Sequence, residues 1–316
     1  MKRAVLAFLV GCTSPEWSAT TSEVIGGEPT SPGEYPGVGA LMYDFGDGQP
    51  QFGCTGTLIA PTVVLTAGHC LDPQLVGSSV PGFTLALDTF TTPPVVPGAM
   101  AIPHEQFDLE MLPPEGGFSE TFDIGLLVLA QPITEVAPNL MPRPTDVPSL
   151  VPGMEMQIAG YGATDAQGGG GGVMFDATTA MISLDTTELQ VGMGAPQPQN
   201  CYGDSGGPGF ATVGGTRRVI GVVSRSFASG PDCDAGGIDT RVDAYLPWIH
   251  AHLPPGTAVP CDSGLAEPCE EPEPEEPEPM PGDDEDGGGC CSTGGGGTGS
   301  ALLALALGLL MLRRRG

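Results

Sequence analysis

The sequence predicts an all-β fold that ends in a single helix. Its apolar residues come in short runs divided by Gly, Pro, Asp and Ser, a pattern typical of short strands joined by frequent turns. Hardly any segment repeats its apolar residues at helical spacing. These observations favour a β-sandwich or β-barrel over roughly 230 residues, which is enough for one large domain or two small halves.

The candidate strands follow one another along the central part of the chain. The clearest runs are GTLIA (56–60), TVVLTA (62–67), FTLALD (83–88), IGLLVLA (124–130), MEMQIAG (154–160), TAMISLD (179–185) and RRVIGVVS (217–224). Segment 242–253 is the exception, because its apolar residues share one helical face: Val242, Tyr245, Leu246, Ile249 and Leu253. It predicts a terminal helix, in which Pro247 is tolerated if the first turn begins near Ala244.

The charge balance excludes one class of partner. The chain has 10 Lys and Arg against 38 Asp and Glu, for a formal net charge of -28, and its only lysine is Lys2. Because nucleic acids are bound by clustered cations that neutralise their phosphates, we expect no unaided binding to nucleic acid. An anionic membrane surface would also repel the chain. Residues 24–253 hold five arginines and 24 acids, a net charge of -19.

The N-terminus has the composition of a secretory signal. Residues 1–12, MKRAVLAFLVGC, combine a basic start with an apolar run, so we expect a signal peptide and an oxidising compartment outside the cytoplasm. The stretch LVGC also resembles a bacterial lipobox, in which Cys12 would carry a lipid; a plain signal with a chance cysteine is the alternative. Residues 13–23 would then be a propeptide.

The C-terminus divides into a spacer and a tail. Residues 254–289 alternate Glu with Pro and lack apolar periodicity, which predicts a disordered acidic linker in which Cys261 and Cys269 could pair. Residues 290–316 join two cysteines, a Gly-rich hinge, an apolar run and three arginines. This tail resembles the C-terminal sorting signals of myxobacterial surface proteins (the MYXO-CTERM type); a permanent membrane anchor is the alternative. Both interpretations place the domain outside the inner membrane, and we expect a secreted protein associated with the cell surface or outer membrane.

Three segments carry candidate chemistry. They contain His69 in TAGHC, Asp123 in TFDIGLLVL and Ser205 in CYGDSGGP. Taken alone, the histidine could be an ordinary packed residue, the aspartate a surface residue at a strand start, and the serine part of a Gly-rich turn. A carboxylate beside so apolar a strand is costly to bury without a partner, however, and GDSGG is rare by chance.

Together these motifs resemble the trypsin-like serine proteases of the chymotrypsin family, over about 230 of the 316 residues. The resemblance implies two six-stranded antiparallel β-barrels, with His69, Asp123 and Ser205 as a catalytic triad in the cleft between them. It also implies disulfides Cys54–Cys70 and Cys201–Cys233. Further matching positions are VIGG at 24–27 and GYG at 160–162, where the family usually has Gly-Trp-Gly.

By this resemblance Ser205 is the nucleophile, His69 the general base and then acid, and Asp123 the residue that fixes the imidazole tautomer. The N–H groups of Gly203 and Ser205 would form the oxyanion hole. Asp204 would pair with the α-amino group that cleavage before Val24 releases, so the precursor should be inactive. Glu23 precedes this bond in place of the usual basic residue, which makes self-activation by Arg- or Lys-directed cleavage doubtful and points to another activating protease.

The residues expected around the specificity pocket are Gln199, Ser224, Ser226, Gly237 and Asp239. Gln199 carries no charge, so the default substrate has a neutral side chain at the cleavage site. Asp239 near the pocket base would instead restore a basic preference, unless it forms an ion pair with Arg241 or Arg225. Arg225 stands where the family usually has an aromatic residue, which would change the wall beside the substrate.

The sequence therefore predicts a secreted, surface-tethered serine endopeptidase that acts on proteins or peptides as a monomer. We expect no cofactor and no metal, since the remaining histidines lack the spacing of metal ligands. A non-catalytic surface binding module that kept the protease fold is the alternative. Because every triad position is occupied, the enzyme is favoured.

Overall fold

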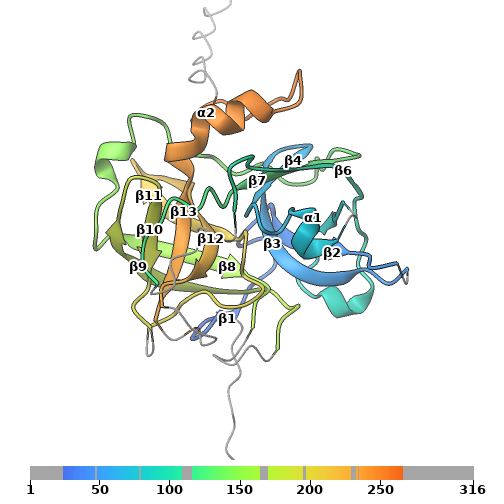
Figure 1. The fold of residues 1–316 in the computed structure, drawn as a ribbon, viewed down its shortest axis with the longest axis horizontal. Helices are drawn as coiled ribbons and strands as arrows, with labels where there is room; N and C mark the ends of the chain where they lie inside the picture. Colours follow the sequence, from blue (N-terminus) through green and yellow to red (C-terminus); the bar gives the residue numbers. More distant parts are fainter. Residues whose placement is uncertain are drawn as a thin grey trace, which may run out of the picture. The chain divides into compact units, whose positions relative to one another are not determined.

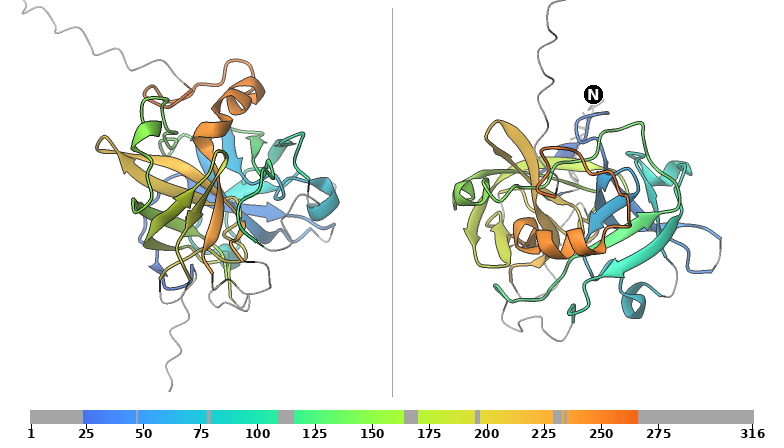
Figure 2. Two further views of the ribbon diagram at one scale, coloured as in Figure 1. Left: turned by 60° about the vertical axis from the view of Figure 1, so that its left-hand side comes forward. Right: turned by 90° about the horizontal axis from the view of Figure 1, so that it is seen from above.

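The structure, a computed structural model, describes residues 24–46, 48–77, 80–108, 116–163, 170–194, 197–228, 233 and 235–265. In these ranges the chain forms two antiparallel sheets and a C-terminal helix (Figure 1). The two sheets lie side by side, and both views in Figure 2 keep their strands on separate sides of the domain.

The first sheet has six strands in the order β5-β2-β3-β4-β7-β6. Their bounds are β2 Val38–Tyr43, β3 Gln51–Ala60, β4 Val63–Thr66, β5 Gly82–Thr84, β6 Gly98–Pro103 and β7 Gly125–Leu129. The edge strands do not form a ladder with each other, but Phe83 of β5 forms a bridge with Val96, just before β6. The short helix α1, Pro73–Val76, and a 3-10 turn, Thr89–Thr91, lie in the connections.

The second sheet closes into a ring, because β9 pairs with both β10 and β8 in the order β9-β10-β13-β12-β11-β8. Its strands are β8 Glu155–Gly160, β9 Phe175–Leu184, β10 Glu188–Val191, β11 Pro208–Val213, β12 Thr216–Ser226 and β13 Gly237–Arg241. The two-residue strand β1, Glu28–Pro29, adds to β9 as a seventh member. A 3-10 turn, Val147–Ser149, precedes β8.

The predicted all-β class with two barrels and a terminal helix is confirmed. The second barrel carries one more strand than expected, and the first is an open half-barrel whose edges meet at a single bridge. A large apolar cluster draws residues from both sheets and from the helix, among them Leu58, Phe210 and Ile249. A second cluster fills the second barrel. Burial of these side chains, about 1.5–3 kcal/mol each, holds the fold together.

The C-terminal helix α2, Val242–His252, begins two residues earlier than the proline suggested. Its buried residues are four of the five on the predicted face: Val242, Tyr245, Leu246 and Ile249; the fifth, Leu253, is the C-cap residue and is only partly buried. Pro247 therefore lies inside the helix, where it cannot donate to the carbonyl of Asp243. The packed apolar face outweighs this lost hydrogen bond.

The packed part of the chain continues past the helix. The composition assigned residues 254–289 to a disordered linker, yet Asp262 forms ion pairs with Arg143 at 2.6 Å and with Arg218 at 2.8 Å. Ser263 is fully buried, and the Gly264 N–H donates to the Met141 carbonyl. We call residues 254–265 the C-terminal strap.

Other predicted segments lie outside the described residues. These are the signal and propeptide at 1–23, including Cys12, and the chain from 266 to 316, including Cys269 and the sorting tail. No helix among the described residues is both long and apolar enough to cross a membrane.

Candidate active site

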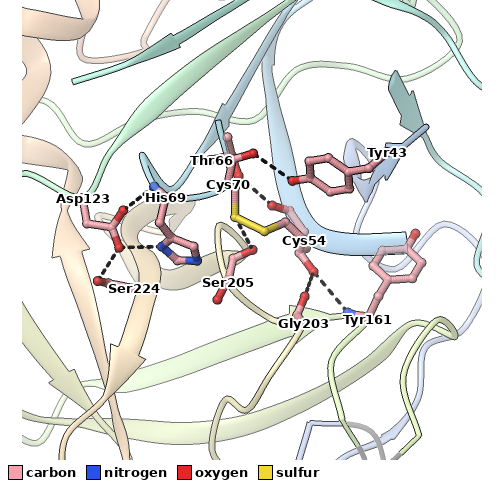
Figure 3. The surroundings of a disulfide bond; sticks show 11 residues. Tyr43, Cys54, Thr66, His69, Cys70, Asp123, Tyr161, Gly203, Ser205 and Ser224 are labelled. Atoms are coloured by element: carbon pink, nitrogen blue, oxygen red, sulfur yellow. Dashed lines mark hydrogen bonds and ion pairs between the residues drawn. A yellow bond between two sulfur atoms is a disulfide. The ribbon is translucent and has the colours of Figure 1, made fainter. Parts of the chain in front are cut away.

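His69 and Asp123 are brought together by two paired strands. His69 follows β4 and Asp123 precedes β7, and the register pairs Thr66 with Gly125. Asp123 accepts the His69 backbone N–H at 2.9 Å through Oδ1 and contacts the ring Nδ1 at 2.8 Å through Oδ2 (Figure 3). The carboxylate therefore fixes both the backbone and the ring, and a proton on Nδ1 leaves Nε2 able to accept one.

Two hydroxyl groups from the second barrel hold Asp123. The Ser224 hydroxyl donates to Asp123 Oδ2 at 2.6 Å, and the Thr240 hydroxyl donates to the Asp123 carbonyl at 2.8 Å. The sequence assigned Ser224 to the specificity pocket alone, whereas its side chain supports the carboxylate. Thr240 was missed, since a threonine inside a strand carries no signal of such a role.

The electrostatics of the pair favour an ionised carboxylate. Burial opposes charge on Asp123, but His69 and the hydrogen bonds from His69 and Ser224 outweigh it, so the pKa of Asp123 lies below 3.8. Burial likewise opposes charge on His69, but Asp123 outweighs it and raises the pKa of His69 above 6.5. The His69 side chain is 23% exposed and can meet a substrate, while that of Asp123 is buried.

Ser205 lies on the other side of the imidazole. In Figure 3 its side chain stands beside the ring, away from Asp123. Its carbonyl accepts the Thr55 N–H at 2.8 Å, a contact that ties the serine turn to β3 of the first barrel. Among the described residues no hydrogen bond joins the Ser205 hydroxyl to His69; such bonds often form only when substrate is bound.

The turn before Ser205 leaves two N–H groups available. Gly203 has φ +95°, a left-handed conformation that favours glycine, and a Cβ there would meet Phe52 at 2.9 Å. The neighbouring N–H groups of Asp204, Gly206 and Gly207 donate to backbone carbonyls. In the described part of the chain the N–H groups of Gly203 and Ser205 have no such acceptor, which suits donors to a developing oxyanion.

Asp204 is fully buried, and backbone groups bind its carboxylate. It accepts the Gly162 N–H at 2.9 Å and the Cys201 N–H at 2.8 Å. Gly160 and Gly162 lie so close to the carboxylate that a Cβ at either position would clash with it. The GYG motif is therefore a cradle for Asp204.

The new N-terminal segment expected after activation already lies in the second barrel. Val24 is fully buried in the second apolar cluster, and the Gln199 N–H donates to the Ile25 carbonyl at 3.1 Å. The pairing of the Val24 amino group with Asp204 stays a prediction.

Two disulfides hold the loops that carry these groups. Cys54 bonds Cys70, next to His69, and Cys201 bonds Cys233, near Ser205. These are the two pairs that the family resemblance implied. Cys261 is disulfide-bonded too. Its predicted partner lies outside the described residues.

The pocket residues differ from the simplest expectation. Gln199 is fully buried, and both ends of its amide are engaged: it donates to the Cys233 carbonyl and accepts the Gly236 N–H at 2.6 Å. It therefore ties two parts of the loop together and offers no free group to a substrate. Gly237 lies against Asn200, while the buried Ser226 hydroxyl has no hydrogen-bond partner among the described residues.

Asp239 is fully buried on β13, and its carboxylate is poorly satisfied. Asn200 donates to Oδ1 at 3.5 Å, whereas Oδ2 has no hydrogen-bond partner among the described residues. Burial, with repulsion from Asp204, raises the pKa of Asp239 to about 8. The alternative ion pairs are not formed, because Arg241 pairs with Asp243 and Arg225 with Glu188.

Comparisons with known proteins agree with this geometry. The trypsin family model matches residues 24–249. The chain belongs to the trypsin family. Fibrinolytic enzyme isozyme C of Lumbricus rubellus is 30% identical over 72% of this chain and 98% of its own length. Bovine chymotrypsin-like elastase family member 1 is 26% identical over 77% of this chain and 94% of its own length. Phenoloxidase-activating factor 3 of Holotrichia diomphalia is 29% identical over 73% of this chain and 72% of its own length. The protein is a serine endopeptidase.

Three residues in this trypsin-family site are of types that often bind metals, but their side chains are already bonded to other groups. Cys54, His69 and Cys70 place their ligand atoms within 4.8 Å of one another. The two sulfurs are bonded to each other, and His69 Nδ1 contacts Asp123. Because zinc binds thiolates and free imidazole nitrogens, this group does not offer a zinc site.

Proposed function

We propose that this endopeptidase cleaves peptide bonds with the triad His69, Asp123 and Ser205. The observation that carries the proposal is the 2.8 Å contact between His69 Nδ1 and Asp123, with Ser205 on the opposite side of the ring (Figure 3). That arrangement aligns a carboxylate, an imidazole and a hydroxyl in the order that proton transfer requires.

Each group has one task in the reaction. Ser205 Oγ attacks the scissile carbonyl carbon while His69 Nε2 takes the hydroxyl proton, and the imidazolium then gives that proton to the leaving amine. The resulting acyl-enzyme is hydrolysed by water along the same route. Asp123 stabilises the imidazolium, and the N–H groups of Gly203 and Ser205 bind the oxyanion, each worth about 3 kcal/mol.

Activation would follow cleavage between Glu23 and Val24. The support is the buried position of Val24 and the burial of the Asp204 carboxylate, which would gain an ammonium partner once the chain is cut. Because Glu23 precedes the bond, a separate protease with a matching preference would do the cutting. One relative is named as a phenoloxidase-activating factor, so at least one protease similar to this chain is named for activating another protein.

The preferred substrate would carry a neutral side chain at the cleavage site. Gln199 uses its amide within the protein, and burial raises the pKa of Asp239 to about 8, which favours the uncharged carboxyl at neutral pH. Neither residue then offers a negative charge to an arginine or lysine. Profiling of the activated enzyme with a peptide library at pH 7 tests this, and a dominant preference for basic residues would contradict it.

The enzyme would act outside the cytoplasm as a monomer. Support comes from the signal-like residues 1–12 and from the disulfides, which form in oxidising compartments. The tail at 290–316, with or without a lipid on Cys12, would tether it to the cell surface. After cleavage before Val24 only the C-terminal tail could tether the enzyme. Residues 13–23 contain no cysteine, so no disulfide could hold a lipidated propeptide to the catalytic chain.

A labelling experiment tests the catalytic proposal. A fluorophosphonate probe should label Ser205 in protein whose N-terminus is Val24, and Ser205→Ala should abolish the labelling. Hydrolysis should also rise with pH through a pKa above 6.5, as His69 loses its proton. Correctly processed protein that takes no label would instead favour a non-catalytic binding module.

A further inference from the structure

Arg225 and Glu188 form an ion pair directly behind the triad. Arg225 follows Ser224 on β12, and Glu188 begins β10. Both terminal guanidinium nitrogens donate to the carboxylate, at 2.7 and 2.8 Å. The Arg225 side chain is 14% exposed and that of Glu188 is 2% exposed, so water screens the pair weakly. A planar bidentate pair of this kind is geometrically specific.

The pair also binds the segment 117–121, which leads to Asp123. Arg225 donates to the Gly117 carbonyl at 3.0 Å. Glu188 accepts the Ser119 N–H at 2.7 Å and the Thr121 hydroxyl at 3.1 Å. One ion pair therefore joins two strands of the second barrel to a connection of the first.

Asp123 needs such support because the chain before it is strained. Phe122 has φ +52°, a left-handed conformation that costs a residue with a Cβ. Held at 117–121 on one side and paired in β7 on the other, the chain cannot relax at Phe122 without moving the carboxylate.

A second connection reaches Asp123 through Ser224. Arg225 Nη1 lies 3.4 Å from the Ser224 hydroxyl, and that hydroxyl lies 2.6 Å from Asp123 Oδ2. The guanidinium is therefore within about 6 Å of the carboxylate that stabilises His69. Glu188 balances the charge of the guanidinium. Segment 117–121 contains one acid, Glu120, and that residue is exposed.

We infer that Arg225 and Glu188 are positioning residues of the triad, which hold segment 117–121 and Ser224 so that Asp123 stays bonded to His69. This inference rests on the proposed function. It assigns a role to the side chain that stands in place of an aromatic residue in the cleft wall.

The test compares Arg225→Gln and Glu188→Gln in the protein cleaved before Val24. We expect each to lower kcat about tenfold with KM changed less than threefold, because Asp123 loses its alignment. An unbalanced charge within about 10 Å of the imidazole should also move the acid limb of kcat/KM by a few tenths of a pH unit. Glu188→Gln leaves a positive charge and should move the limb to lower pH; Arg225→Gln should move it to higher pH.

The matched control is Arg241→Gln. Arg241 pairs with Asp243 at 2.6 Å, and the two side chains are 11% and 6% exposed. Like Arg225, Arg241 directly follows a residue whose hydroxyl donates to Asp123, in this case Thr240. Its own side chain donates to Asp243 and to the Asp185 carbonyl, and among the described residues it forms no hydrogen bond with segment 117–121. We expect a comparable loss of stability, kcat within twofold and an unmoved acid limb.

The outcomes separate this inference from the proposed function. If fluorophosphonate fails to label the parent protein, the proposed function is wrong. If the parent is labelled but both glutamine variants keep the kcat and acid limb of the control, the positioning role is wrong. Should the glutamine variants not fold, Arg225→Lys keeps the charge but loses the bidentate geometry. It should then lower kcat with the limb unmoved, and parental kcat would overturn the inference.

Discussion

Asp239 has the least satisfied environment of the carboxylates near the site. Its Oδ2 lies against Gly209 and Gly221, with no hydrogen-bond partner among the described residues, and the buried Asp204 carboxylate repels it. Burial without compensation favours the protonated acid. The pKa of about 8 therefore makes this residue a source of pH-dependent stability.

Asp239→Asn should become more stable relative to the parent as pH rises. The pKa of Asp239 is raised from 3.8 to about 8 on folding, so between these values the native state retains a proton that the unfolded chain releases. The free energy of unfolding of the parent should fall across that range by at most about 1.4 kcal/mol per pH unit. The variant should show no such fall from this position, because an asparagine side chain does not ionise. Urea unfolding at pH 5 and pH 8 measures it. A stability difference equal at both values would show that Asp239 ionises normally.

Residues that stand in a recognisable motif could be singled out from the sequence, and contacts between distant residues could not. His69, Asp123 and Ser205 each stand in a recognisable run of residues. Ser224 was singled out for the pocket, but its bond to Asp123, 101 positions away, depends on how the two barrels meet. Glu188 carried no signal at all, because nothing near it in sequence marks it as the partner of Arg225.

At the scale of elements, the clearest apolar runs overlap β3, β4, β5, β7, β8, β9 and β12. They did not single out β2, β10, β11 or β13, although the residues of these strands are almost all buried. The pattern also missed β6, Gly98–Pro103, because that strand has no buried residue and has proline at its end. It extended β5 too far: the run FTLALD predicted a strand over 83–88, but the strand ends at Thr84, whose hydroxyl accepts the Ala86 N–H in a turn. Local side-chain competition of this kind does not alter the apolar pattern.

The C-terminal strap shows a different limit of composition. Residues 254–265 have few apolar side chains, of which Val259 and Leu265 pack against the core. Charge also holds the strap: Arg218 is fully buried and donates to both the side chain and the carbonyl of Asp262. Polar contacts to an internal arginine are invisible in a hydropathy pattern.

Removing the strap should destabilise the domain. A chain that ends at Leu253 leaves the buried Arg218 without Asp262, which should cost on the order of 2 kcal/mol or more relative to a chain that ends at Leu265. Asp262→Asn in the longer chain keeps the packing of Ser263 and should show a smaller loss. Chemical denaturation compares the three proteins. Equal midpoints for the two chain lengths would mean that the domain ends at the helix.

At the scale of the whole molecule, the scarcity of cations limits where a protease that cuts after basic residues can act. Residues 24–253 contain no lysine and only five arginines. Arg217, Arg218 and Arg225 lie in β12 and Arg241 ends β13, while Arg143 is followed by proline. Strand residues are poor protease substrates because cleavage requires local unfolding. A protease that cuts after basic residues should therefore leave the folded domain intact.

Glu23→Arg should convert the precursor into one that trypsin activates. The wild-type bond after Glu23 is not a trypsin site, so trypsin treatment should yield no Val24 N-terminus and no fluorophosphonate labelling. The variant should gain both, since a basic residue then precedes Val24 in an otherwise trypsin-resistant domain. N-terminal sequencing of the labelled product measures the outcome, and Glu23→Gln is the control that removes the charge without creating a site. If the variant is cut before Val24 but stays unlabelled, cleavage there does not activate the enzyme. If uncut wild-type protein already takes the label at the rate of the cut variant, no zymogen exists. The burial of Val24 would then serve only the fold.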